Sequence, residues 1–264
     1  DRGAEFWDGS TTHNPTIHKF YGKYYLYYMG NTGDKKVVSV PGKPRINWVH
    51  RNNQRIGVAV AESPNGPWKR FDKPVLDVSP NEDAYDALMT SNPSVCQMPD
   101  GKILMVYKAV GKKHPLPGGG PVVHMVAIAD SPTGPFKKYP DPVFTFEGER
   151  FPAEDPYIWY QDGKFRAIVK RIKHEGGERK FSLVHYDSED GIQWNKAKNF
   201  EISERIVEWE NGRKQQFTHL ERPQVYRENG EPIALLCAAD TLDANGVRQS
   251  FNLQIPLKIK KTSN

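Results

Sequence analysis

Side chains suited to carbohydrate chemistry gather just before four prolines of the sequence, Pro15, Pro93, Pro156 and Pro223. They are carboxylates, amides, hydroxyls, imidazoles and a guanidinium. A sugar presents many hydroxyl groups, and each needs both a hydrogen-bond donor and an acceptor. Cleavage of a glycosidic bond also needs one carboxylic acid to protonate the leaving oxygen and a second carboxylate to activate water or attack the sugar.

The first two prolines share an internal spacing of polar residues. Asp8 and Asp86 each lie six residues before an asparagine, Asn14 and Asn92, that directly precedes its proline. Asp8 and Asp86 are the candidates for the catalytic base, and the alternative source of that base is a blade missing from the four visible repeats. The alternative is that each aspartate caps a turn by accepting backbone N–H bonds, and that Asn-Pro only shapes the entry to a strand.

The last two prolines follow further carboxylates, Asp155 and Glu221. We expect Glu221 to act as general acid, and Asp155 to orient the substrate or tune that acid. The alternative for Glu221 is a structural ion pair with Arg222. The expected substrate-binding residues are His13, Asn14, Asn92, Glu154, Lys170, His219 and Arg222. Lys170 has a counterpart at the same place of the preceding unit, Lys108.

The segments that position these side chains have the sequence pattern of a repeated β-hairpin. Each proline is followed by a glycine-bearing turn ("YGK", "DGK", "DGK", "NGE") and then by an alternating apolar run. A further strand and an aromatic residue follow, so one unit holds about four strands in roughly 65 residues. Units of this kind with almost no helix predict β-propeller blades. We expect the aromatic residues to pack between blades; they are Trp68, Phe136 and Trp194.

The sequence resembles the five-bladed β-propeller glycoside hydrolases, in the style of families 43 and 117. The resemblance rests on "HNPTI" with "GKYYLYYMG", on the strand-like runs Ile56–Ser63 and Val126–Ser131, and on "EDPYIW" and "LERPQV". It implies an all-β fold, a five-bladed β-propeller, with four blade-like repeats visible and one missing or degenerate. We expect one domain over residues 1–264, with units near 8–80, 86–148, 149–205 and 215–260.

The same resemblance implies an exo-acting, inverting glycosidase that degrades a plant or algal oligosaccharide. The sequence departs from family 43 at Asn14 and Asn92, where the resembling enzymes carry aspartate, and an amide cannot act as a base. Two alternatives therefore stay open, a non-catalytic glycan-binding propeller and a disaccharide phosphorylase resembling family 130. The basic residues that such a phosphorylase would use for phosphate are Arg51, Arg55, His13 and His219.

Two insertions fall at the same place of the first two units, over residues 32–54 and 111–121. Long loops of this kind often carry function, and we expect both to overhang the same face. Trp48, His50 and Arg51 of the first insertion are candidates for sugar contacts.

Composition narrows the remaining choices. The 264 residues carry a formal charge of +5 with acidic and basic residues interleaved, which does not indicate a nucleic-acid partner. The sequence contains no run of 18 apolar residues, so it does not predict a membrane span. No cysteine or histidine spacing predicts a metal ligand set, so we expect no cofactor beyond a structural cation on the propeller axis. Cys96 and Cys237 lie in apolar runs, which favours buried thiols and leaves a disulfide open.

Localisation is inferred from the expected substrate. We expect a secreted or periplasmic protein, although "DRGAEFW" at the start is no signal peptide. The expected partner is the oligosaccharide, and the sequence leaves the oligomeric state undetermined.

Overall fold

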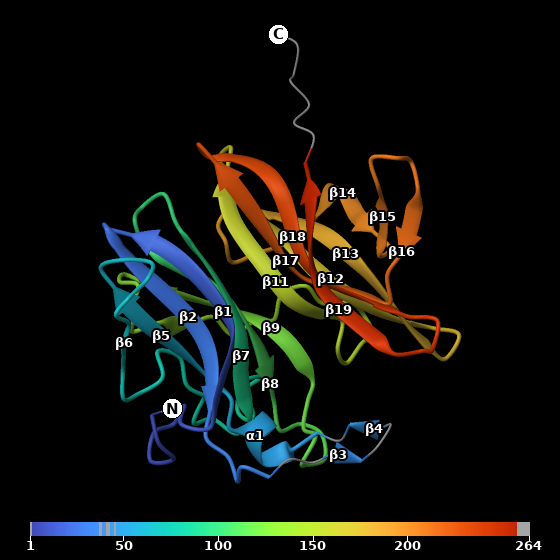
Figure 1. Ribbon diagram of the computed structural model, residues 1–264. Helices are drawn as coiled ribbons and strands as arrows, with labels where there is room; N and C mark the ends of the chain where they lie inside the picture. The colour runs from blue at the N-terminus through green and yellow to red at the C-terminus, as the bar shows by residue number, and fades with distance from the viewer. Residues whose placement is uncertain (1, 37–38, 41–42, 45, 258–264) are drawn as a thin grey trace. The chain divides into compact units, whose positions relative to one another are not determined.

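The structure is a computed structural model that describes residues 2–36, 39–40, 43–44 and 46–257 (Figure 1). The chain divides into two compact units, Asp1–Phe151 and Pro152–Asn264. Regular structure in the described residues is β-strand apart from one helical turn and a half, α1 (Trp48–Asn52). The all-β prediction is therefore confirmed.

The first unit contains two four-stranded antiparallel sheets, coloured blue to green in Figure 1. Their strand orders are β1-β2-β5-β6 and β10-β9-β8-β7, as expected for blades built from consecutive hairpins. The first sheet consists of β1 (Thr11–Phe20), β2 (Lys23–Asn31), β5 (Arg55–Ala61) and β6 (Lys69–Arg70). The second consists of β7 (Met89–Gln97), β8 (Ile103–Val110), β9 (Val122–Ala129) and β10 (Lys137–Lys138). A small hairpin joins β3 (Ser39–Val40) and β4 (Lys43–Pro44).

The second unit contains two more blade-like sheets, coloured yellow to red in Figure 1. The third sheet has the order β11-β12-β13-β14 and the fourth has three described strands, β17-β18-β19. The third consists of β11 (Ala153–Gln161), β12 (Lys164–Glu175), β13 (Glu178–Ser188) and β14 (Asn195–Ser203). The fourth consists of β17 (His219–Glu228), β18 (Glu231–Leu242) and β19 (Arg248–Pro256). Between them lies the hairpin of β15 (Ile206–Glu208) and β16 (Lys214–Gln216).

The glycine-bearing turns form the predicted hairpins. Three of the four turns hold two consecutive residues at positive φ, which is the conformation of a type I′ turn and matches the twist of the flanking strands. The three pairs are Tyr21-Gly22, Asp162-Gly163 and Asn229-Gly230. Four consecutive hairpins thus start the four blade-like sheets, and no fifth blade is present among the described residues.

Each unit has its own hydrophobic core. In the first unit, Tyr27 and Val58 of the first sheet pack with Tyr107 and Met125 of the second, and all four are almost fully buried. Phe136 packs against this core as predicted. In the second unit, a separate cluster joins the third and fourth sheets through buried residues that include Leu183, Phe217, Leu220 and Leu235.

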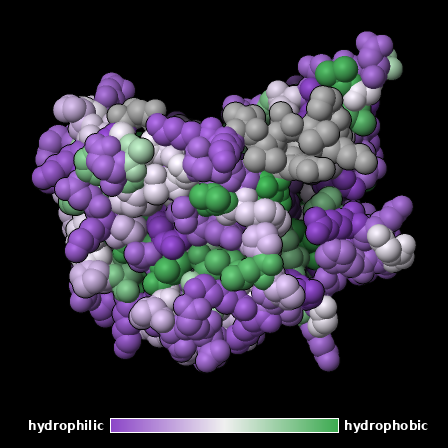
Figure 2. All heavy atoms as spheres, turned by 90° about the horizontal axis from the view of Figure 1, so that it is seen from below, coloured by the Kyte–Doolittle hydropathy of each residue, from purple (hydrophilic) through white to green (hydrophobic). Residues whose placement is uncertain are grey.

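Both cysteines are buried and free, so the favoured interpretation of two thiols is confirmed. Burial raises the pKa of the Cys237 thiol to about 12. No helix within the described ranges is long and apolar enough to cross a membrane. Hydrophilic residues cover most of the face seen in Figure 2, and hydrophobic residues show there in smaller groups.

Candidate active site

The residue before each of the four prolines has a left-handed backbone conformation. Its φ is 52° at Asn14, 46° at Asn92, 50° at Asp155 and 52° at Arg222. At each of these places the register with the next strand shifts by one residue, which marks a β-bulge. Asparagine and aspartate tolerate this conformation, whereas an arginine is strained in it. Because bulges re-aim side chains, the repeated phrase of the sequence is a repeated device for placing polar groups at a strand start.

The register also defines which residues are equivalent. The residue just before each bulge is His13, Ser91, Glu154 or Glu221. Ser91 pairs with Lys108 and Glu154 pairs with Lys170, so the predicted match between the two lysines is confirmed.

In the first unit the two Asn-Pro phrases meet. The Nδ2 atom of Asn14 donates a hydrogen bond of 2.7 Å to Oδ1 of Asn92, although the residues are 78 positions apart. The starts of β1 and β7 therefore lie together within this unit. His13, beside Asn14, is exposed.

Asp8 and Asp86 lie in equivalent, buried positions of the first two sheets. Asp8 accepts a 2.7 Å hydrogen bond from the Tyr28 hydroxyl and pairs with Arg70 at 3.2 Å. Asp86 accepts a hydrogen bond from the Tyr107 hydroxyl and pairs with Lys138. Each carboxylate thus joins the second strand of its sheet to the fourth.

These contacts also affect the tyrosines. Burial, and then the nearby carboxylate, raise the pKa of Tyr28 and of Tyr107 well above the ordinary value. Asp8 lines an open pocket of about 400 Å³. His13, Tyr28, Trp68 and Arg70 line the same pocket, so Trp68 borders open space while its counterpart Phe136 packs in the core.

In the second unit three predicted site residues form one charged cluster. The Nζ atom of Lys170 lies 2.7 Å from Oε2 of Glu154 and 2.8 Å from Oε1 of Glu221. The lysine comes from β12, and the two glutamates come from equivalent positions of β11 and β17. Because both oxygens contact the same nitrogen, they lie no more than 5.5 Å apart.

Lys170 is one of the most deeply buried charges of the chain, with 4% of its surface exposed. Burial opposes its positive charge. The carboxylates of Glu154, Asp155 and Glu221 outweigh that effect and raise the pKa of Lys170 above its ordinary value. The lysine is therefore a permanent cation that holds two partly exposed carboxylates at the strand starts.

Beside Glu221 lies a histidine whose ring is fixed by a buried carboxylate. Asp240 of β18 accepts from the backbone N–H of His219 at 2.8 Å, and both of its oxygens lie 3.0 Å from Nδ1 of His219. Arg248 of β19 pairs with the same aspartate at 2.8 Å. A carboxylate partner places the imidazole proton on Nδ1, which leaves Nε2 for other chemistry.

These side chains border an open pocket of about 450 Å³. A carboxylate, an imidazole and a guanidinium at one pocket can bind sugar hydroxyl groups and exchange protons with them. The polar lining residues are His219, Glu221, Asp240, Arg248, Ser250 and Asn252. Arg222, beside Glu221, is exposed.

The two insertions of the first unit, which were expected to overhang the same face, contact each other. Arg51 donates to the carbonyl oxygen of Gly118 at 2.7 Å, and Asn52 donates to that of Pro117 at 3.0 Å. Residues 37, 38, 41, 42 and 45 of the first insertion lie outside the described residues.

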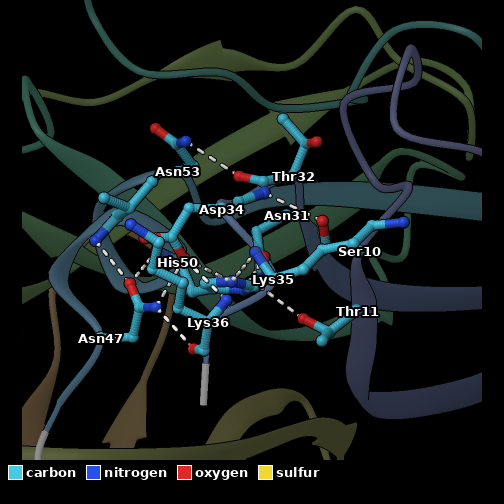
Figure 3. Close-up of polar contacts among 12 residues, drawn as sticks. Ser10, Thr11, Asn31, Thr32, Asp34, Lys35, Lys36, Asn47, His50 and Asn53 are labelled. Atoms are coloured by element: carbon cyan, nitrogen blue, oxygen red, sulfur yellow. Dashed lines mark hydrogen bonds and ion pairs between the residues drawn. The ribbon is translucent and has the colours of Figure 1, made fainter. Parts of the chain in front are cut away.

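Figure 3 shows the polar contacts through which His50 stabilises the first insertion. Its Nε2 accepts from the backbone N–H of Lys35 at 3.1 Å, and its Nδ1 lies 3.1 Å from Oδ1 of the buried Asn31. Asn47 caps helix α1 and also donates to Asp34 at 2.8 Å. Both ring nitrogens of His50 are therefore engaged in contacts that stabilise this loop.

The phosphate-binding set expected for a phosphorylase is largely engaged in protein contacts. Arg55 pairs with Asp77 at 2.6 Å and also donates to backbone carbonyl groups. Arg51 donates to the opposite loop. His219 lies in the second unit against Asp240.

Sequence reasoning missed Asp240 and Arg248. Asp240 is a charged residue at the end of the apolar run "IALLCAAD". Because side chains alternate along a strand, this position could have indicated that Asp240 lies on one face of the sheet. Nothing in the sequence alone links Arg248 to that aspartate, because the link depends on the register of β18 with β19.

Among the residues that the structure describes, no group of three or more His, Cys, Asp or Glu side chains is placed to hold a metal ion. The positive charge beside the carboxylates is supplied by Lys170 and Arg248 instead.

Comparison with solved structures shows that the fold is similar to that of several glycoside hydrolases. The chain is similar to the endo-arabinase from Bacteroides thetaiotaomicron VPI-5482 (TM-score 0.59, 14% identity, 98% of this chain and 79% of the other). It is also similar to a family 117 glycoside hydrolase from the marine bacterium Zobellia galactanivorans (TM-score 0.57, 21% identity, 93% and 60%). A third similar structure is a thermostable family 43 glycoside hydrolase (TM-score 0.57, 14% identity, 98% and 78%).

These likenesses confirm the expected resemblance at the level of the fold. No protein-family model matches the sequence. No curated protein matches it either.

Proposed function

We propose that the chain is a glycoside hydrolase that cleaves an oligosaccharide at the strand starts of its blade-like sheets. The observation that carries this proposal is the contact of Glu154 and Glu221 with the same Lys170 ammonium, beside an open pocket. A scaffold gains little from three charges at one strand start, because their desolvation offsets their attraction. The fold, which is that of known glycosidases, supports the same conclusion.

Glu221 is the proposed general acid. It borders the pocket next to His219, where a leaving oxygen can be reached. Lys170 holds the Glu221 side chain in place by direct contact at 2.8 Å. The same lysine also contacts Glu154, so it can keep one carboxylate partner while Glu221 carries a proton. Asp155, which is buried beside Glu154 and raises the pKa of Lys170, is proposed to tune this cluster.

We propose an inverting mechanism and exo-action, as the resemblance to families 43 and 117 implies. Inverting glycosidases hold their two carboxyl groups roughly 6.5–9.5 Å apart, whereas retaining ones hold them about 5–5.5 Å apart. Since the facing oxygens of Glu154 and Glu221 are within 5.5 Å, Glu154 is too close to be the base of an inverting pair. Asp8 is the proposed base, because it lines an open pocket with His13, and Asp86 is its structural counterpart.

The proposed substrate is a plant or algal oligosaccharide and the proposed location is secreted or periplasmic. We also propose that the fold is a five-bladed propeller, with a fifth blade in addition to the four blade-like sheets. The first test is a screen for release of reducing sugar from arabinan, agar and other plant and algal oligosaccharides, with and without inorganic phosphate. Release without phosphate supports the hydrolase. Release that requires phosphate would instead support a phosphorylase.

A glycan-binding protein without turnover is the second candidate. It is favoured by one observation, the hydrogen bond that engages the Asn14 amide with Asn92 at the two places where family 43 relatives carry aspartate. Binding of an oligosaccharide in calorimetry, together with no release of reducing sugar from it, would support this candidate.

A further inference from the structure

A charged groove of about 420 Å³ lies in the second unit, beside the cluster of Lys170. It is formed by β12, β13, the end of β14 and the residues around the β15–β16 hairpin. Its basic lining residues are Arg171, Lys173, Arg179, Lys180 and Arg205, and its acidic ones are Glu175, Glu178, Glu201 and Glu204.

Three of the five cations are neutralised by ion pairs inside the groove. Arg171 pairs with Glu201 at 2.9 Å. Lys173 and Lys180 both pair with Glu175, at 3.0 and 2.8 Å. With Glu178 and Glu204 counted as well, the five cations that line the groove face four carboxylates, which leaves a formal surplus of one positive charge.

The other two cations have no carboxylate partner. Arg179 donates from Nε to the ring of His174 at 3.3 Å, and Arg205 donates from a terminal nitrogen to the carbonyl oxygen of Thr218 at 2.6 Å. Within the described ranges, no carboxylate forms an ion pair with either guanidinium. Both arginines line the groove, so its unpaired positive charge is concentrated on them.

Arg205 shows one further sign of a binding role. Its φ is 67°, a strained value for an arginine, and such strain is concentrated at functional positions. Its guanidinium lines the groove, where an oxyanion can accept charge-assisted hydrogen bonds from it.

Phe181 connects this groove to the proposed catalytic cluster. Its ring lies 5.7 Å from the guanidinium of Arg205 and 5.6 Å from Nζ of Lys170. The ring of His219, which lines the pocket with Glu221, lies 5.9 Å from the same phenylalanine. An oligosaccharide chain with one unit at Glu221 can therefore extend past Phe181 into the groove.

We propose that this groove is a subsite for a sugar unit that carries an anionic group, a carboxylate or a sulfate ester, held by Arg205 and Arg179. The inference extends the proposed function. It rests on that function in one respect, because the path of the oligosaccharide past Glu221 assumes that Glu221 binds the substrate. Its binding part does not depend on turnover, because the two arginines recognise the anion whether or not a bond is cleaved.

The test is calorimetric binding of two matched pairs of oligosaccharides. One pair is tetragalacturonate and its carboxyl-reduced, neutral form, and the other is a sulfated carrageenan tetrasaccharide and its desulfated form. We expect the wild type to bind one anionic member about tenfold more tightly than its neutral form, as one charge-assisted contact predicts. Preference in the first pair identifies a carboxylate, and preference in the second identifies a sulfate.

The variants are Arg205→Gln and Arg179→Gln, and the control is Lys164→Gln, whose lysine pairs with Glu189 on the surface of the same unit. We expect both arginine variants to lose the preference and the control to keep it, with all three folded by circular dichroism. Equal binding of charged and neutral members by the wild type, no binding of any of the four, or an unchanged preference in both arginine variants would overturn the proposal. Anionic preference together with no release of reducing sugar from any oligosaccharide of the screen would keep the subsite and reject the hydrolase.

Discussion

The ammonium of Lys170 lies 2.8 Å from the carboxylate of Glu221, although β12 and β17 place the two residues 51 positions apart in the sequence. The same ammonium contacts Glu154, which occupies in β11 the place that Glu221 occupies in β17. Two copies of one strand-start position are thus joined by a single buried cation. This relationship connects the repeated fold to the proposed chemistry.

Replacing Lys170 with methionine tests that connection. The change leaves two carboxylates at one strand start without their cation, so we expect the free energy of unfolding to fall by about 3 kcal/mol. Lys164→Met, which removes an exposed ion pair with Glu189, should change the free energy of unfolding far less, because solvent screens such a pair. Urea denaturation of both variants measures the difference, and equal losses would contradict a structural role for the cluster.

The same Lys170→Met variant should also lower activity. The proposed acid Glu221 loses the ammonium that contacts it at 2.8 Å, so its position is less fixed and we expect release of reducing sugar to fall by roughly tenfold or more. Because the raised pKa of Lys170 keeps it charged throughout the neutral range, the wild-type pH–rate profile should show no step from the lysine itself. Unchanged release by a folded Lys170→Met variant would contradict the role of this contact.

The stereochemistry of the product separates the two roles open to Glu154. Proton NMR of the first product formed should show inversion at the anomeric carbon, because the proposed base is not Glu154. Retention would make Glu154 and Glu221 the catalytic pair, as their separation of at most 5.5 Å permits.

Asp8 and Asp86 offer a matched comparison within one fold. Both Asp8→Asn and Asp86→Asn should lower the free energy of unfolding by roughly 2 kcal/mol, because each leaves a partly buried cation without its carboxylate. Only Asp8→Asn should lower kcat, by about 10²–10⁴-fold, the contribution of a general base. Equal kcat for the two folded variants would remove Asp8 from the mechanism.

His18 gives the first unit a predictable pH response. It packs against Phe20 and Tyr27, and burial lowers its pKa from 6.5 to about 4. The unfolded chain therefore binds more protons than the folded one between these values, so stability present above pH 6.5 is lost as the pH falls toward 4. His18→Gln should flatten this loss in urea titrations at several pH values, whereas the exposed His174→Gln should not.

Local features of the sequence were sufficient to predict the four strand starts. A proline, the residue before it and a glycine turn fix backbone angles over a few positions, and these angles recur at Asn14, Asn92, Asp155 and Arg222. The contact between Glu221 and Lys170 could not be predicted from such local features, because it depends on the packing of one sheet against another.

The surroundings of single side chains were harder to predict. Trp68 and Phe136 follow the same Gly-Pro text, but Phe136 packs against the core of the first unit whereas Trp68 lines a pocket. Asp240 was overlooked because a strand pattern shows that a residue is buried, and not which side chain of the next strand it will contact.

Substitution of Glu221 by glutamine is the most direct test of the central claim. The variant keeps the size and hydrogen-bonding capacity of the side chain and removes its acid, and Glu228→Gln on the exposed end of the same strand is the control. On the oligosaccharide that the screen identifies, we predict that release of reducing sugar falls by at least about 100-fold in Glu221→Gln and is unchanged in Glu228→Gln. Full release by a folded Glu221→Gln variant would contradict the account.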